Sequence, residues 1–172
     1  MHLQTKIQQT EGNILVDPTY TCDYFDPILH RLLSLPRQDL SSSNASIAEM
    51  IRLGAILYLI AVRQSFGIYP IRVKIQIRKL SVLLISFEDS ETKDRTWDKH
   101  GLGWMELWVN TLGGVLNDEI DEAPFFAKHL HDAMHRMAVM TYGDLEDRLR
   151  EFAWINEIHG ALLTDFRRKL IH

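Results

Sequence analysis

Large apolar residues recur at every third or fourth position along most of the chain, which is the spacing of one face of an α-helix. The pattern predicts an all-α fold, an irregular array of six or seven helices with short connections. The predicted helices cover residues 26–33, 46–65, 71–87, 104–115, 124–142, 144–152 and 156–172, and Gly143 ends the fifth of them.

The segment 46–65 has the clearest helix signals. Ser46 and Glu49 have the spacing of a capping box, in which both side chains satisfy free N–H groups at a helix start. Apolar residues such as Leu53 and Leu57 occupy most faces of the segment, so we predict a central, buried helix that ends near Gly67.

Residues 71–78 carry two competing patterns. Apolar residues alternate there with polar and charged ones, as in a strand. Over twice that length, however, apolar residues follow the helical period as far as Leu84 and Phe87. Because the longer pattern is the more informative one, we predict a helix from 71 to 87.

Three other segments are less regular. The first 25 residues have weak periodicity, which predicts a loosely ordered N-terminal segment before a single helical domain at 26–172. Residues 88–101 are polar and charged and predict a surface loop. Gly113 and Gly114 each cost about 1 kcal/mol inside a helix, so they indicate a helix end or close packing.

Composition excludes several classes of protein. The 172 residues are 46% apolar and 24% charged, as expected for one globular domain. A net charge of −4 disfavours direct nucleic-acid binding, and a single cysteine excludes disulfides within the chain and a cysteine zinc site. No signal peptide is recognised, and the longest uncharged apolar run has ten residues, whereas a membrane span needs about 20.

Histidines form the most conspicuous candidate site. His131 and His135 are four residues apart and share one helix face with the spacing of two zinc ligands, and His129 is nearby. A metalloprotease motif requires glutamate after the first histidine, whereas this chain has Asp132 and no indicated third ligand. A solvated polar helix face explains the pattern better than a metal site does.

Other candidates also have structural explanations. The acidic run at 117–122 precedes the helix that starts at Pro124, where the helix dipole favours negative charge. Cys22 has no assignable histidine partner and is not predicted to be a nucleophile. A cationic run is interleaved with isoleucines and predicts a solvated helix edge rather than a phosphate site. Its residues are Arg72, Lys74, Arg78 and Lys79.

Several packing segments occur in a recognisable order. The chain has Ile51-Arg-Leu-Gly-Ala-Ile-Leu-Tyr-Leu59, Phe66-Gly-Ile-Tyr-Pro70, a Trp-rich segment from Trp104 to Gly114, and Phe152-Ala-Trp154. This order resembles the regulatory domain of fungal-specific transcription factors, the helical region that accompanies a zinc binuclear cluster DNA-binding module. The resemblance covers about residues 45–170 and corresponds to the C-terminal part of that domain.

The resemblance implies a non-enzymatic regulatory or interaction domain in the nucleus, with a protein partner or self-association. The family's zinc cluster needs six cysteines, so this chain, with one, is expected not to bind DNA directly. No catalytic, metal, cofactor or DNA-binding residue is predicted. The residues expected to matter are packing residues: Leu53, Tyr58, Trp104, Trp108, Leu112, Phe152 and Trp154.

The alternative function is a helical small-molecule-binding protein or enzyme with a pocket near Trp104, Trp108 and His131. Such a protein needs titratable groups that face inward. A packing module is instead expected to expose His131, Asp132 and His135 to solvent.

Overall fold

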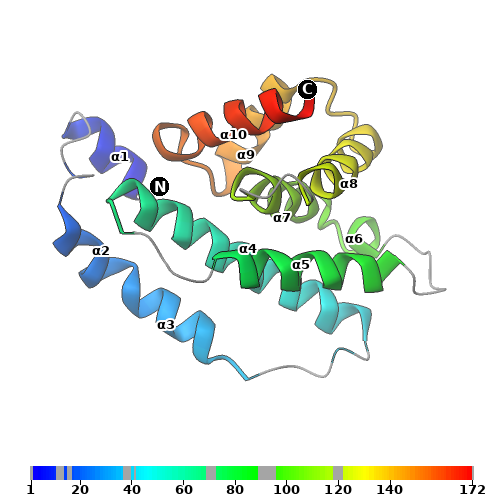
Figure 1. Ribbon diagram of the computed structural model, residues 1–172, viewed down its shortest axis with the longest axis horizontal. Coiled ribbons are helices and arrows are strands. Elements are labelled where there is room, and N and C mark those ends of the chain that lie inside the picture. The colour runs from blue at the N-terminus through cyan, green and yellow to red at the C-terminus, as the bar shows by residue number, and fades with distance from the viewer. Residues whose placement is uncertain are drawn as a thin grey trace.

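Ten α-helices occur in the described part of the chain, which comprises residues 2–10, Ile14, 17–36, Leu40, 42–68, 73–88, 96–117 and 122–171 of a computed structural model (Figure 1). No strand occurs within these ranges, so the predicted all-α class is confirmed, although there are more helices than the six or seven expected. The helices are α1 (His2–Gln9), α2 (Pro18–Tyr24), α3 (Asp26–Ser34), α4 (Ser43–Ser65), α5 (Val73–Glu88), α6 (Thr96–Lys99), α7 (Gly103–Val115), α8 (Ala123–Arg136), α9 (Tyr142–Phe152) and α10 (Asn156–Ile171).

Helix α4 runs through the middle of the molecule, with α5 in front of it and α7 above it in the view of Figure 1. Its apolar residues face α3, α5, α7 and α10, which explains why they occur on most sides of the helix. Leu53, Leu57 and Val62 have no exposed surface. The predicted central role of this segment is therefore confirmed.

By length and composition alone, α4 is apolar enough to cross a membrane. However, 56% of its most apolar window is buried inside the protein, as in the core helix of a folded domain. Length and composition are therefore weak grounds for a membrane span here.

Helix α7 is buried on every side from Glu106 to Val115. Its polar side chains bond within the helix: the Thr111 hydroxyl donates to the Leu107 carbonyl at 2.7 Å, and the Asn110 amide donates to the Glu106 carbonyl at 2.9 Å. Such bonds offset the cost of burying polar groups.

Glycines let aromatic rings reach the backbone of α7. A Cβ on Gly113 would overlap the Phe126 ring of α8, and one on Gly114 would lie 2.5 Å from the Phe166 ring of α10. Close packing near the helix end therefore explains the glycine pair seen in the sequence.

The crossing of α4 and α7 depends on a third glycine. A Cβ on Gly54 would lie 2.9 Å from a ring carbon of Trp108 and 2.9 Å from a methyl carbon of Val109. Both atoms belong to buried side chains that cannot turn toward solvent. Gly54 thus sets how closely the two central helices approach each other.

We expect Gly54→Ala to destabilise the protein by about 1–3 kcal/mol, because overpacking outweighs the better helix propensity of alanine. Urea denaturation measures the change. Gly143→Ala is the control, since the nearest atom to its Cβ is the Thr141 hydroxyl at 3.5 Å. Equal effects of the two substitutions would contradict this account of the crossing.

Two predicted helix starts are wrong by one turn or less. The N-cap of α4 is Ser42, whose hydroxyl accepts a hydrogen bond from the Ala45 N–H at 3.2 Å. Ser46 lies inside the helix. Asp144 is not the cap of α9 but the third helical residue of a capping box. Its carboxylate accepts from the backbone N–H of Thr141 at 2.9 Å, and the Thr141 hydroxyl accepts from the Asp144 N–H at 3.0 Å. Neighbouring hydroxyl and carboxylate residues offer several caps, so sequence alone selects poorly among them.

Helix α8 ends at Arg136, several residues before the predicted end at Gly143. Ala138 adopts a left-handed φ of 53°, and its N–H donates to the His135 carbonyl at 3.3 Å. The next N–H, of Val139, donates to the Met134 carbonyl at 2.9 Å, which completes a Schellman cap. Met140, which lies within the predicted helix 124–142, is consequently beyond the end of α8 and 82% exposed.

The same cap ends α4, but with a glycine in the left-handed position. Gly67 has a φ of 74°, its N–H donates to the Gln64 carbonyl at 2.9 Å, and the Ile68 N–H donates to the Arg63 carbonyl at 3.0 Å. The chain therefore contains one Schellman cap without backbone strain and one in which alanine adopts an unfavourable conformation.

We expect Ala138→Gly to stabilise the protein by about 1 kcal/mol and Gly67→Ala to destabilise it by a similar amount. A Cβ at Gly67 meets no atom within 4 Å, so only backbone conformation changes there. Thermal unfolding of the two variants measures both effects. Opposite signs support the cap assignment, whereas a loss of stability in Ala138→Gly would refute it.

The first 25 residues, expected to be loosely ordered, contain the helices α1 and α2. Ile7 of α1 is 2% exposed and packs in a small second core with Val62, Phe66, Ile155 and Ile158. Each helix is too short for a clear apolar stripe, which explains why periodicity missed both of them.

The polar segment 88–101, expected to be a loop, also contains a short helix, α6. Trp97 of α6 is buried, with its ring centroid 6.3 Å from that of Phe87. Residues 89–95 lie outside the described ranges. A single aromatic residue anchors this segment to the core, and a single residue gives no periodic signal.

The competition between strand and helix patterns at 71–78 ends in favour of the helix, as predicted, with α5 described from Val73 to Glu88. Ile77, Leu80 and Leu84 are buried on the inner face of α5. The exposed Ile75, between the partly buried Val73 and the buried Ile77, produced the strand-like alternation. Residues 71 and 72 lie outside the described ranges.

Candidate functional site

The expected pocket residues meet different surroundings. Trp108 is buried, and its indole N–H donates to the Ala153 carbonyl at 2.9 Å. Trp104 is 39% exposed, and the Arg148 guanidinium lies 5.1 Å from its ring centroid. His131 faces solvent on α8. The structure gives no support to a pocket formed by Trp104, Trp108 and His131.

Most of the expected packing residues are in the core. Leu53, Trp108, Leu112 and Trp154 are buried, and Tyr58 is partly buried beside them. Burial raises the pKa of the Tyr58 phenol to about 12.

Two of the expected core residues lie at the surface instead. Trp104 is partly exposed at the start of α7, and Phe152 is 50% exposed at the end of α9. Phe152 nevertheless packs edge-on to Trp108, with 5.4 Å between the ring centroids. Both residues cover the core rather than fill it.

The histidine cluster divides into one buried and two exposed side chains. His131 and His135 face solvent, as does Asp132. His129 is buried, its ring centroid lies 4.2 Å from that of Phe125 in a tilted arrangement, and its Nδ1 lies 3.1 Å from Glu88 Oε1. Within the described ranges, no group of three His, Cys, Asp or Glu residues is arranged to hold a metal ion.

Cys22 and the acidic run add no site. Cys22 is exposed on α2. Of the acidic run, Asn117 is buried and Glu122 immediately precedes α8, whereas residues 118–121 lie outside the described ranges.

An ion cluster of buried Glu106, half-buried Arg136 and exposed Asp98 joins α6, α7 and α8. The Arg136 guanidinium donates to the Glu106 carboxylate and lies 3.7 Å from the Asp98 carboxylate. Burial raises the pKa of Glu106, although Arg136 opposes this shift. The signal in the sequence was Glu106, a single charge within the apolar stretch of α7, and it was not recognised.

His159 is the second buried polar group that sequence reasoning missed. It has no exposed surface and lies between the rings of Tyr58 and Trp154, at centroid distances of 5.0 Å and 4.7 Å. Its Nδ1 lies 3.1 Å from the backbone nitrogen of Ile155 and 3.0 Å from the Ile155 carbonyl oxygen, directly before the start of α10 at Asn156.

This arrangement keeps the His159 imidazole neutral. Nδ1 bonds to the backbone of Ile155, and Nε2 has no hydrogen-bond partner among the described residues. Burial lowers the pKa of His159 to about 4. The residue is therefore a structural element of the core whose protonation opposes folding.

We expect His159 to make stability depend on pH. Its pKa in the folded protein is about 4, below the unfolded value of about 6.5, so the unfolded chain binds the proton more tightly. The contribution of neutral His159 to the free energy of unfolding is fully present above about pH 6.5. It falls by about 3 kcal/mol as the pH drops to about 4. In His159→Phe this contribution should disappear from urea denaturation curves recorded across that range. Parallel pH profiles for both proteins would exclude the assignment.

A surface groove lies between α4 and α5. It encloses about 440 Å³, and its lining is mainly apolar. Glu49 and Arg52 lie on its α4 side, where Arg52 donates to the two Glu49 oxygens at 2.5 and 2.6 Å. The residues lining the groove are Leu40, Glu49, Arg52, Ile75, Arg78, Lys79, Val82 and Leu83.

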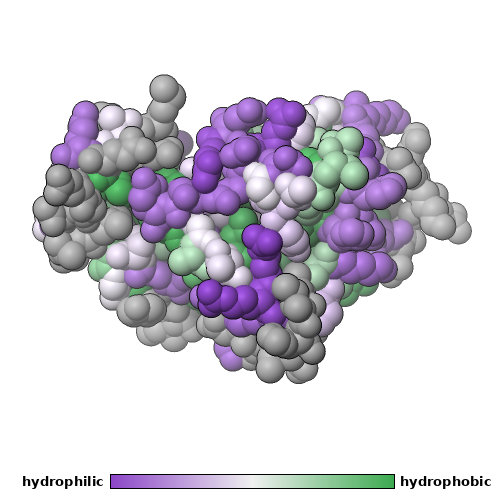
Figure 2. All heavy atoms as spheres, turned by 90° about the horizontal axis from the view of Figure 1, so that it is seen from above, coloured by the Kyte–Doolittle hydropathy of each residue, from purple (hydrophilic) through white to green (hydrophobic). Residues whose placement is uncertain are grey.

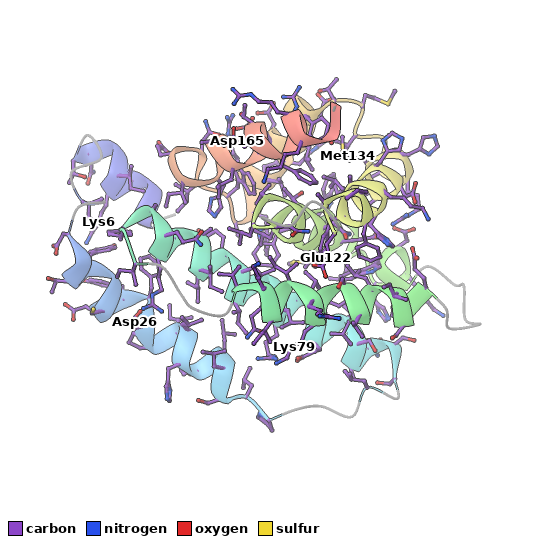
Figure 3. The ribbon with its side chains drawn as sticks, viewed as in Figure 1. Lys6, Asp26, Lys79, Glu122, Met134 and Asp165 are labelled. Atoms are coloured by element: carbon purple, nitrogen blue, oxygen red, sulfur yellow. The ribbon has the colours of Figure 1, made fainter. Side chains whose placement is uncertain are left out.

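The cations of α5 are placed differently from the pair on α4. Arg78 and Lys79 are exposed, and neither forms an ion pair with another residue in the described ranges. Figure 3 shows Lys79 on the opposite side of α5 from Glu122. The sequence predicted a solvated helix edge here, and the exposure of these residues agrees, while Arg72 lies outside the described ranges. The groove between these cations and α4 was not predicted.

No family model, no curated protein and no solved structure matches this chain. The resemblance to the regulatory domain of fungal transcription factors therefore stays a prediction from the order of the packing segments.

Proposed function

We propose that the chain is a non-enzymatic regulatory or interaction domain of a fungal transcription factor-like protein, acting in the nucleus by packing against another protein. The observation that carries the proposal is the groove beside α5. Ile75 and Val82 are 46% and 55% exposed, and both line it. Exposed apolar side chains gathered in a groove are typical of a binding surface.

The distribution of titratable groups supports a packing role over a catalytic one. His131, Asp132 and His135 face solvent, which is the arrangement expected of a packing module. The buried Glu106 bonds to the half-buried Arg136, and this pair links α7 to α8. These groups have structural roles that need no substrate.

The segments behind the resemblance are packing segments in this structure as well. Ile51–Leu59 forms the middle of α4, and Trp104–Gly114 forms most of α7. A zinc binuclear cluster cannot form within a chain that has one cysteine, so a regulatory role requires a DNA-binding partner or module.

A reporter assay tests the proposal. The chain is fused to an unrelated DNA-binding module in a fungal cell, and transcription from a matching promoter is measured. We expect the fusion to change transcription several-fold, and Val82→Asp to abolish the change because it puts a charge into the groove. Met140→Asp is the matched control, since Met140 is exposed outside the groove.

Two results would contradict the proposal. One is unchanged transcription with a fusion that is folded and abundant in the nucleus. The other is an equal loss of effect in the Val82→Asp and Met140→Asp fusions, which would mean that the groove has no special part in regulation.

A further inference from the structure

We propose that the groove beside α5 binds an acidic amphipathic helix of a partner protein. The inference rests on the proposed function, because it names the partner of the same surface. It is carried by two features together: an apolar stripe with helical spacing, and cations beside it that have no carboxylate partner among the residues that the structure describes.

The apolar stripe has the length of a helix contact. Ile75, Val82 and Ile85 are exposed along the outer face of α5. They span ten residues, or about 15 Å at 1.5 Å per residue. An apolar helix face has anchors at positions i, i+3, i+4 and i+7, and fits such a stripe. A small molecule would fill the groove but leave Ile85 uncovered.

The charge of the groove is positive despite the net charge of −4 on the whole chain. Glu49 is neutralised by Arg52, which also donates to the Leu32 carbonyl at 2.7 Å and is held in place. Arg78 and Lys79 therefore determine the local charge.

The opposite side of the molecule differs from this surface. Figure 2 looks onto the side where α10 lies, and hydrophilic side chains cover most of it, with hydrophobic atoms visible between them. Exposed apolar residues also occur on α3, where Ile28 and Leu33 are 50% and 52% exposed, but they do not line the groove.

A second copy of the chain is a poorer occupant. The most acidic exposed helix in the described ranges is α9, but its carboxylates already have partners. Glu146 and Asp147 each lie 3.1 Å from Arg150, and Glu151 lies 3.6 Å from Arg148. Docking α9 in the groove would exchange ion pairs rather than add them. A partner with unpaired carboxylates gains more from Arg78 and Lys79.

Fluorescence anisotropy with designed peptides tests the proposal. Three labelled amphipathic peptides of roughly 15 residues share one leucine face and differ only in flanking residues, which are glutamate, glutamine or lysine. We expect the glutamate peptide to bind at least about tenfold more tightly than the glutamine peptide, and the lysine peptide most weakly. Added salt should reduce the preference for glutamate.

Charge reversal locates the site. The double variant Arg78→Glu with Lys79→Glu should lose the preference for the glutamate peptide and favour the lysine peptide. The double variant Lys128→Glu with Lys169→Glu is the control, because both lysines are exposed on α8 and α10, outside the groove. Circular dichroism checks that both variants are folded, which is expected because all four side chains are exposed.

The possible outcomes separate the inference from the proposed function. Equal binding of all three peptides, abolished by Val82→Asp, would overturn the acidic partner but leave the interaction surface intact. Self-association by light scattering without peptide binding would identify a second copy as the occupant and refute the inference. Binding of dodecanoate alone would identify a small anionic ligand and also refute it. The reporter result decides the regulatory role independently of these outcomes.

Discussion

Because α7 is buried on every side from Glu106 to Val115, each helix around it must approach its backbone closely. Glycine makes this possible at three places. Trp108 packs against Gly54 of α4. The rings of Phe126 and Phe166 pack against Gly113 and Gly114 of α7. Aromatic rings against bare backbone bury much apolar area at short distance between helices. The positions of α4, α8 and α10 follow from these contacts.

The burial of α7 also explains the polar groups in the interior. Glu106 cannot reach water from α7, and Arg136 of α8 supplies its counter-charge. His159 fills the space between Tyr58 and Trp154 as a neutral ring, with its Nδ1 used at the start of α10. The outer face of α5 is not covered by any of this packing. Its apolar and cationic side chains are available to a partner, and the proposed function depends on them.

The sequence predicts the parts of the fold that repeat over several turns. The all-α class, the central position of α4 and the helical state of α5 all follow from long apolar stripes, as in Leu53, Leu57 and Ile60. Features that depend on single residues escaped prediction. Trp97 is the one apolar core residue of α6, and Ala138 ends α8 although alanine gives no signal for a left-handed turn. The groove could not be predicted, because it requires knowing how α4 and α5 lie against each other.

Native-state hydrogen exchange tests the central position of α7 most directly. If close packing around α7 organises the fold, its amides from Leu107 to Leu112 should exchange only through global unfolding, with the full free energy of unfolding measured in urea. Amides of α1 and α2, which contact only the edge of the core, should exchange at lower free energies. Exchange of the α7 amides as fast as those of α1 would contradict the account.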